Sequence, residues 1–242
     1  MTSLPMPNAE LVEELVIANK ILYKYGVVDG FGHISVRHDA DPTHFLMSHH
    51  LAPPLVTAAD IVTFNLEGES INDRPGRRYY SERFIHSEIY KVRPDVVSVV
   101  HSHALSLIPF ANTKRKLRPM YHMSGFLGKG APVFDIRKKG GITNMLVRTP
   151  ELGCALAERL GPAPVVLMRG HGATMVGESI RAAVYRAVYS MQNAVAQLGA
   201  ITLGGNDVTY LDPLEAEAYD KYSGEVMHRP WNMWRAEALG EL

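Results

Sequence analysis

Cysteine is nearly absent from this sequence, because Cys154 is the only one in 242 residues. A single cysteine excludes a disulfide within the chain and a metal site built from several thiolates. Net charge is absent as well, since 25 basic and 25 acidic side chains balance. This balance gives no indication of nucleic acid or an anionic membrane as a partner. Long apolar runs are also missing, and none approaches the roughly 18 residues of a membrane span.

The start of the chain lacks the basic residues and the apolar core of a signal peptide, so we expect a cytoplasmic protein. The composition is otherwise that of an ordinary globular protein, with 46% hydrophobic and 21% charged residues. This length predicts a single domain over residues 1–242. Eleven histidines are many for this length, and any metal must therefore be held by imidazole and carboxylate groups.

Hydrophobic periodicity predicts helices and strands that alternate along the chain. We expect helices over residues 8–25, 81–92, 149–160 and 179–198, and two shorter ones from Pro213 and near Trp231. Strands are expected over residues 34–37, 45–48, 61–66, 96–100, 165–168 and 174–176. Residues 124–141 are interpreted as a loop with a short strand inside it. Such interleaving favours a mixed sheet with helices on both faces.

Three histidines follow two of the predicted strands. His101 and His103 come directly after the apolar residues 96–100. Side chains at i and i+2 of a strand point the same way, so both imidazoles could reach one metal ion. His171 lies between Gly170 and Gly172, and these glycines permit a tight backbone that would bring the ring to a strand end. The alternative for each residue is a buried structural histidine.

Glu82 is the best candidate for a fourth ligand, because it begins the helix that leads into the histidine strand. A carboxylate there could leave the metal and act as an acid or a base. The alternative is a first-turn glutamate that the helix dipole favours. His33 either faces a substrate anion or belongs to a turn, and His50 either lines the same cleft or lies in a solvated loop. His86 is interpreted as a structural histidine.

Taken together, these motifs resemble the class II aldolase/adducin family in their order and spacing. They are Ser81-Glu82, Arg93-Pro94-Asp95, His101-Ser102-His103-Ala104 and Arg169-Gly170-His171-Gly172. The resemblance implies an α/β fold, a three-layer αβα sandwich around a mixed, mainly antiparallel sheet. It also implies a homotetramer with active sites where subunits meet.

By matched position, the resemblance makes His101, His103 and His171 metal ligands, and Glu82 the resting fourth ligand and the catalytic acid/base. Three imidazoles and one carboxylate suit Zn²⁺ or Mn²⁺, and Fe²⁺ is a further possibility. We expect one divalent ion per subunit.

The sequence departs from the sugar-phosphate enzymes of this family where those enzymes hold phosphate. Gly32-His33 stands in place of a Gly-Asn pair, and Tyr80 replaces the first of two paired serines. A Ser/Thr-Gly turn is replaced by Ser48-His49-His50-Leu51-Ala52-Pro53. Because hydroxyls and free backbone N–H groups usually hold phosphate, we expect no sugar-phosphate substrate.

The variant motifs resemble instead a decarboxylase branch of the family, which acts on hydroxylated aromatic or pyridine carboxylates or on related ring-cleavage products. We therefore expect a metal-dependent decarboxylase, a carbon–carbon lyase of catabolism with a small carboxylate as its substrate. Glu82 is the expected proton donor, and His33 or His50 would assist it. Breaking a C–C bond leaves electrons on carbon, and a chelated divalent metal would stabilise that charge.

Several residues are candidates for substrate contacts. Tyr80 or Trp231 could stack on a substrate ring, or each could simply pack in the core. Arg83, Lys129 or Arg137 could bind a second substrate carboxylate.

Three other functions stay open. The chain could be an aldolase that cleaves a non-phosphorylated hydroxy-keto acid, a non-catalytic adducin-like interaction module, or an iron-dependent oxygenase. Retention of the three histidines and Glu82 argues against the interaction module.

Overall fold

The computed structural model describes residues 4–72 and 76–242, within which seven strands form a sheet. Across the sheet the strands are β3 (Ile61–Asn65), β2 (His44–Ser48), β1 (His33–Arg37), β4 (Ser98–Ser102), β7 (Gly172–Gly177), β6 (Val165–Met168) and β5 (Val133–Phe134). Neighbouring strands are antiparallel except β5 and β6, which are parallel. The expected mixed, mainly antiparallel sheet is confirmed.

Helices connect the strands and follow the last one. They are α1 (Ala9–Lys24), α2 (Arg83–Val92), α3 (Ile108–Asn112), α4 (Arg137–Gly140), α5 (Pro150–Leu160), α6 (Ile180–Gly204), α7 (Pro213–Val226) and α8 (His228–Leu239). Short 3₁₀ turns are η1 (Pro53–Leu55), η2 (Ala58–Asp60), η3 (Leu105–Leu107) and η4 (His122–Leu127). The segment 124–141, expected as a loop with a short strand, contains part of η4, β5 and the single turn α4.

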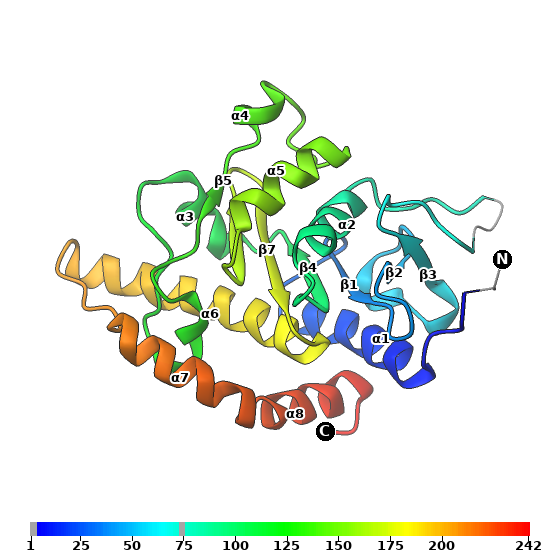
Figure 1. Cartoon of the computed structure of the whole chain (residues 1–242). Coiled ribbons are helices and arrows are strands. Elements are labelled where there is room, and N and C mark those ends of the chain that lie inside the picture. Colours follow the sequence, from blue (N-terminus) through cyan, green and yellow to red (C-terminus); the bar gives the residue numbers. More distant parts are fainter. Residues whose placement is uncertain (1–3, 73–75) are drawn as a thin grey trace.

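The sheet is the middle of three layers (Figure 1). Helices α1, α6 and α8 lie along one face, where Leu15 and Val184 belong to one hydrophobic core. Helices α2 and α5 cover the other face, where Ile85 and Leu156 belong to a second core. Two buried cores on opposite faces require side chains that alternate along each strand. The αβα sandwich expected from the sequence is confirmed.

Local signals explain the ends of α1. The side-chain oxygen of Asn8 accepts a hydrogen bond from the N–H of Glu10 at 2.9 Å and caps the first turn. Gly26 follows the last turn with a φ of 70°, a left-handed conformation that favours glycine. The helix expected over residues 8–25 is therefore confirmed.

Two other helices differ from expectation at one end. Helix α2 begins at Arg83, so that Glu82 takes its N-cap position. Helix α6 runs to Gly204 instead of ending at Leu198, and both Leu198 and Ile201 still pack against the core.

Strand β4 lies in the centre of the sheet, between β1 and β7. Its register pairs His101 with His33 of β1 and with Thr174 of β7. Val99 belongs to the core under α2 and α5, and Val100 belongs to the core on the opposite face. Alternation therefore turns His101 toward α2 and α5.

Across the described ranges, the structure contains no helix with both the length and the apolar character that a membrane crossing requires.

Candidate metal centre and active-site cavity

The paired histidines lie at the end of β4. His101 is fully buried within the strand, and His103 follows the strand directly. Their Nε2 atoms lie 2.9 Å apart, so the i, i+2 spacing brings both rings to one point as predicted. The Nδ1–H of His101 donates to the carbonyl of Ala173 at 3.2 Å. A neutral imidazole has only one N–H, so this bond leaves a lone pair on Nε2 of His101.

The third histidine joins them from the turn between β6 and β7. The Nε2 of His171 lies 3.1 Å from the Nε2 of His103. Gly170 has a φ of 66°. A Cβ atom at Gly172 would lie only 2.0 Å from the carbonyl oxygen of Ser102. The absence of a side chain at residue 172 therefore lets β7 pass close to β4, and this approach places the third ring.

Glu82 completes the group from the start of α2. Its Oε2 lies 3.5 Å from the Nε2 of His171 and 3.7 Å from the Nε2 of His101. Its Oε1 accepts a hydrogen bond from the backbone N–H of Val147 at 2.9 Å. Burial raises the pKa of Glu82, but the hydrogen bond with His171, the neighbouring imidazoles of His101 and His171 and the N–H of Val147 outweigh burial and lower the pKa to about 2. At neutral pH this group is a carboxylate.

These four side chains, the His101–Glu82 cluster, fit a divalent metal. Their ligand atoms all lie within 4.8 Å of one another. Burial lowers the pKa of His101 and of His103, so both rings are neutral and offer lone pairs. Converging imidazole lone pairs next to a buried carboxylate repel one another unless a cation lies between them. Three nitrogens and one oxygen suit Zn²⁺, and Mn²⁺ or Fe²⁺ could bind the same atoms.

A cavity of about 240 Å³ opens beside the cluster. Glu82 and His103 reach its surface, so the cluster and the cavity form one site. The remaining walls are partly polar and partly apolar, and their side chains include His33, His50, Ser81, Tyr80, Phe31, Leu51, Ala52 and Leu146. The structure therefore brings the predicted residues His33, His50, Tyr80 and Glu82 into one cavity.

Tyr80 and His50 form one corner of this cavity. The ring of His50 meets the ring of Tyr80 edge-on, with 5.4 Å between centroids. The hydroxyl of Tyr80 donates to the carbonyl of Leu51 and lies 3.5 Å from Oγ of Ser48. Burial raises the pKa of Tyr80, so its hydroxyl stays protonated. The phenol thus ties β2 and the following loop to the start of α2.

His33 is joined to the interior by a row of buried polar groups, the Tyr90–His33 chain. The Nδ1 of His33 lies 2.7 Å from the Nε2 of His86, whose Nδ1 lies 2.6 Å from Oγ of Ser35. This Oγ lies 2.7 Å from the hydroxyl of Tyr90, which donates to the carbonyl of Val97 at 3.3 Å. Burial lowers the pKa of His33 far below its usual range and that of His86 to about 3, so both rings are neutral.

The predicted basic residues do not reach the cavity within this chain. Arg83 donates to the carbonyls of Gly68 and Tyr80 and is absent from the cavity lining of the single chain, so its substrate contact stays a prediction. Arg137 pairs with Asp135 at 2.7 Å. Lys129 is exposed on the chain after η4. Among the described residues that line the cavity, none is a lysine or an arginine.

Two residues of the Tyr90–His33 chain, Ser35 and Tyr90, were not expected from the sequence. Ser35 follows His33 by two residues on β1, and Tyr90 follows His86 by four residues on α2. Both spacings place side chains on one face of their element. These two spacings are the sequence signals from which the Tyr90–His33 chain could have been predicted.

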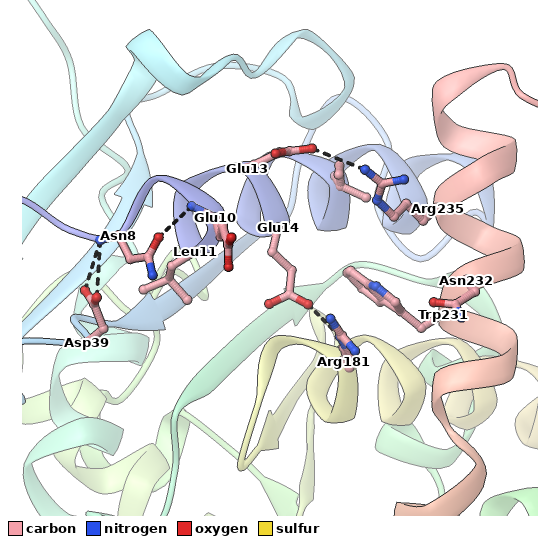
Figure 2. A pocket seen from close by; sticks show the side chains of 11 residues that line it. Asn8, Glu10, Leu11, Glu13, Glu14, Asp39, Arg181, Trp231, Asn232 and Arg235 are labelled. Atoms are coloured by element: carbon pink, nitrogen blue, oxygen red, sulfur yellow. Dashed lines mark hydrogen bonds and ion pairs between the residues drawn. The ribbon is translucent and has the colours of Figure 1, made fainter.

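A separate cavity of about 560 Å³ lies among α1, α6 and α8, on the face of the sheet opposite the cluster. Figure 2 shows its charged side chains in pairs, Glu14 with Arg181 at 2.6 Å and Glu13 with Arg235 at 3.3 Å. Trp231 lines this cavity, so it cannot stack on a ring bound beside the cluster of the same chain. We do not place the active site there, because these carboxylates already have partners.

Comparison with known proteins agrees with this geometry. Residues 13–198 match the family model "Class II Aldolase and Adducin N-terminal domain". The chain is 37% identical over 254 residues to decarboxylase tropJ of Talaromyces stipitatus, an alignment that covers 96% of this chain and 95% of that protein. It is 28% identical over 215 residues to 3,4-dihydroxyphthalate decarboxylase of Arthrobacter keyseri, with 83% of each chain covered.

A solved structure shares the fold. L-fuculose 1-phosphate aldolase from Glaciozyma antarctica superposes with a TM-score of 0.79 at 24% identity, and the match covers 98% of this chain and 96% of that one.

Proposed function

Because the chain belongs to the class II aldolase and adducin family, we propose that it is a metal-dependent decarboxylase of a hydroxylated aromatic or pyridine carboxylate, or of a related ring-cleavage product, in catabolism. One observation carries the proposal: the His101–Glu82 cluster opens into a cavity with apolar walls. The decarboxylase names of tropJ and of the Arthrobacter keyseri enzyme support the same reaction.

The cavity favours a ring over a sugar phosphate. Phe31, Leu51, Ala52 and Leu146 give it apolar walls. The loop after β2 contains Pro53, which has no N–H, and the hydroxyl of Tyr80 is engaged with the carbonyl of Leu51. Few free donors therefore remain for a phosphate group.

The cluster has the groups that decarboxylation needs. A bound divalent metal supplies a Lewis acid that stabilises negative charge on substrate oxygens. The carboxylate of Glu82 takes the proton of the ring hydroxyl next to the substrate carboxylate and delivers it to the carbon that bears the carboxylate. That C–C bond then breaks, CO₂ leaves, and the electron pair returns to the ring as a phenolate. A proton from solvent restores the hydroxyl, so each turnover consumes one proton.

The proposal also includes the assembly and the location of the protein, which we infer from its family. We expect a cytoplasmic homotetramer with sites where subunits meet. Phe31 lines the cavity and is 66% exposed in the single chain, which supports contact with a neighbouring subunit or with substrate. The mass of the purified protein, measured by light scattering after gel filtration, tests the tetramer.

A screen for CO₂ release tests the reaction. The purified protein, with its metal content measured, is incubated with hydroxylated aromatic and pyridine mono- and dicarboxylates that include 3,4-dihydroxyphthalate. We expect CO₂ from at least one of them. Release of an aldehyde or pyruvate from a hydroxy-keto acid, without any CO₂, would make the protein an aldolase. Oxygen consumption would indicate an oxygenase, and a protein that binds no metal and turns over nothing would be an interaction module.

A further inference from the structure

The Tyr90–His33 chain is a row of polar groups under the cavity floor. Ser35 and His86 are fully buried, and Tyr90 and His33 are almost so. Buried polar groups of this kind require hydrogen-bond partners, and here each finds its partner in the next member of the row. The order of donors and acceptors along the row decides whether the free nitrogen of His33, Nε2, has a hydrogen or a lone pair.

One backbone group favours one of the two possible orders. The carbonyl of Val97 can only accept, so the hydroxyl of Tyr90 donates to it. A hydroxyl has one hydrogen, and the contact between Tyr90 and Ser35 therefore uses the hydrogen of Ser35. Oγ of Ser35 in turn accepts from Nδ1–H of His86.

The same assignment of hydrogens continues from His86 to His33, which lines the cavity. His86 is neutral and has its hydrogen on Nδ1, so its Nε2 accepts from Nδ1–H of His33. His33 is almost fully buried, and burial disfavours a charged imidazole, so with its hydrogen on Nδ1 the remaining nitrogen, Nε2, has a lone pair and no hydrogen. His33 is part of the cavity lining, and its Nδ1 is occupied by His86.

We propose that the Tyr90–His33 chain holds Nε2 of His33 as a hydrogen-bond acceptor and so selects substrates whose ring presents a second hydroxyl to it. The selection rests on the proposed function, whereas the placement of the hydrogens does not. A second ring hydroxyl donates to Nε2, while an unsubstituted ring or a carboxylate oxygen at the same point forms no such bond. Ser35, His86 and Tyr90 are positioning residues, because they act through His33.

Nitrogen NMR tests the placement of the hydrogens. In ¹⁵N-histidine protein near neutral pH, long-range ¹H–¹⁵N spectra distinguish the two neutral tautomers. Variants His33→Asn and His86→Gln assign the two rings. We expect both rings as Nδ1–H tautomers in the unchanged protein and an altered tautomer of His86 in Tyr90→Phe. Nε2–H tautomers for both rings in the unchanged protein would overturn the proposal.

Binding of two probes tests the selection. Calorimetric affinities for 2,3-dihydroxybenzoate and 2-hydroxybenzoate are compared in the unchanged protein, in Tyr90→Phe and in Ser35→Ala. The matched control is Tyr185→Phe, because Tyr185 is a buried tyrosine on α6, on the opposite face of the sheet. We expect the affinity for 2,3-dihydroxybenzoate relative to that for 2-hydroxybenzoate to fall about tenfold in Tyr90→Phe and Ser35→Ala, which is the effect of losing one hydrogen bond. The relative affinity should stay unchanged in Tyr185→Phe.

An equal ratio in all four proteins would refute the selection. Neither measurement needs turnover, so a protein that releases no CO₂ but shows both effects would refute the proposed function and keep this inference. A protein that releases CO₂ but shows an equal affinity ratio in all four proteins would keep the proposed function and refute the selection.

Discussion

Replacing Glu82 by glutamine tests the proposed proton transfer. The side-chain shape is kept, and the amide oxygen can still accept from the N–H of Val147, which lies 2.9 Å from Oε1. The atom that faces His101 and His171 becomes an amide nitrogen, which cannot take up a proton. His101, His103 and His171 remain to hold a metal. We therefore expect Glu82→Gln to keep its metal and to lose turnover.

The expected loss of turnover follows from the proposed role of Glu82 as a general acid and base. A positioned general acid or base contributes about 10²–10⁴ to the rate, which corresponds to roughly 3–5 kcal/mol of activation free energy. The lowered pKa of Glu82 keeps this group in the carboxylate form over the whole neutral range, which is the form that takes up the proton. We expect kcat to fall at least about a hundredfold.

The assay is CO₂ release on the best substrate of the screen, with metal content measured by elemental analysis of the same sample. The matched control is Glu88→Gln, because Glu88 is a buried glutamate of α2 that pairs with Lys91 at 2.9 Å and lies outside the cluster. A Glu82→Gln protein with full metal and a kcat close to that of Glu88→Gln would show that Glu82 does not transfer the proton.

Three further outcomes are expected. His103→Ala should lose both metal and turnover, and full metal content in this variant would contradict the ligand assignment. Gly172→Ala, whose Cβ would lie 2.0 Å from the Ser102 oxygen, should lower the free energy of unfolding by several kcal/mol in denaturant titrations. Stability should fall below pH 6.5, because burial lowers the pKa of His86 to about 3 and the unfolded chain binds protons first. From pH 6.5 to about pH 5 this costs ~2 kcal/mol, and His86→Gln should flatten the decline.

The parts of the site that follow from short-range pattern were predictable. His101 and His103 converge because strand residues two apart share a face. The glycines around His171 indicated a tight approach at a strand end, and the contact of Gly172 with Ser102 is that approach.

Other parts depend on long-range register and on competition among partners. His33 meets His101 only because β1 pairs antiparallel with β4 in one register, which no local pattern specifies. Arg83 follows Glu82 directly, yet its guanidinium is captured by the carbonyl of Gly68 in the turn after β3. The sequence shows that Arg83 is adjacent to Glu82, but it does not show which acceptor the guanidinium binds.

One helix face links the cluster to the Tyr90–His33 chain. Glu82 at the N-cap of α2 and His86 and Tyr90 within the helix recur at four-residue intervals, and all three face the sheet. The first contributes to the cluster, and the other two hold the ring of His33. The helix is held closely against α5, because a Cβ at Gly153 would lie 2.4 Å from the carbonyl oxygen of Phe84. A movement of α2 would therefore shift Glu82 and also disturb the hydrogen bonds through which His86 and Tyr90 hold His33, so the proposed proton transfer and the proposed selection both depend on the position of α2.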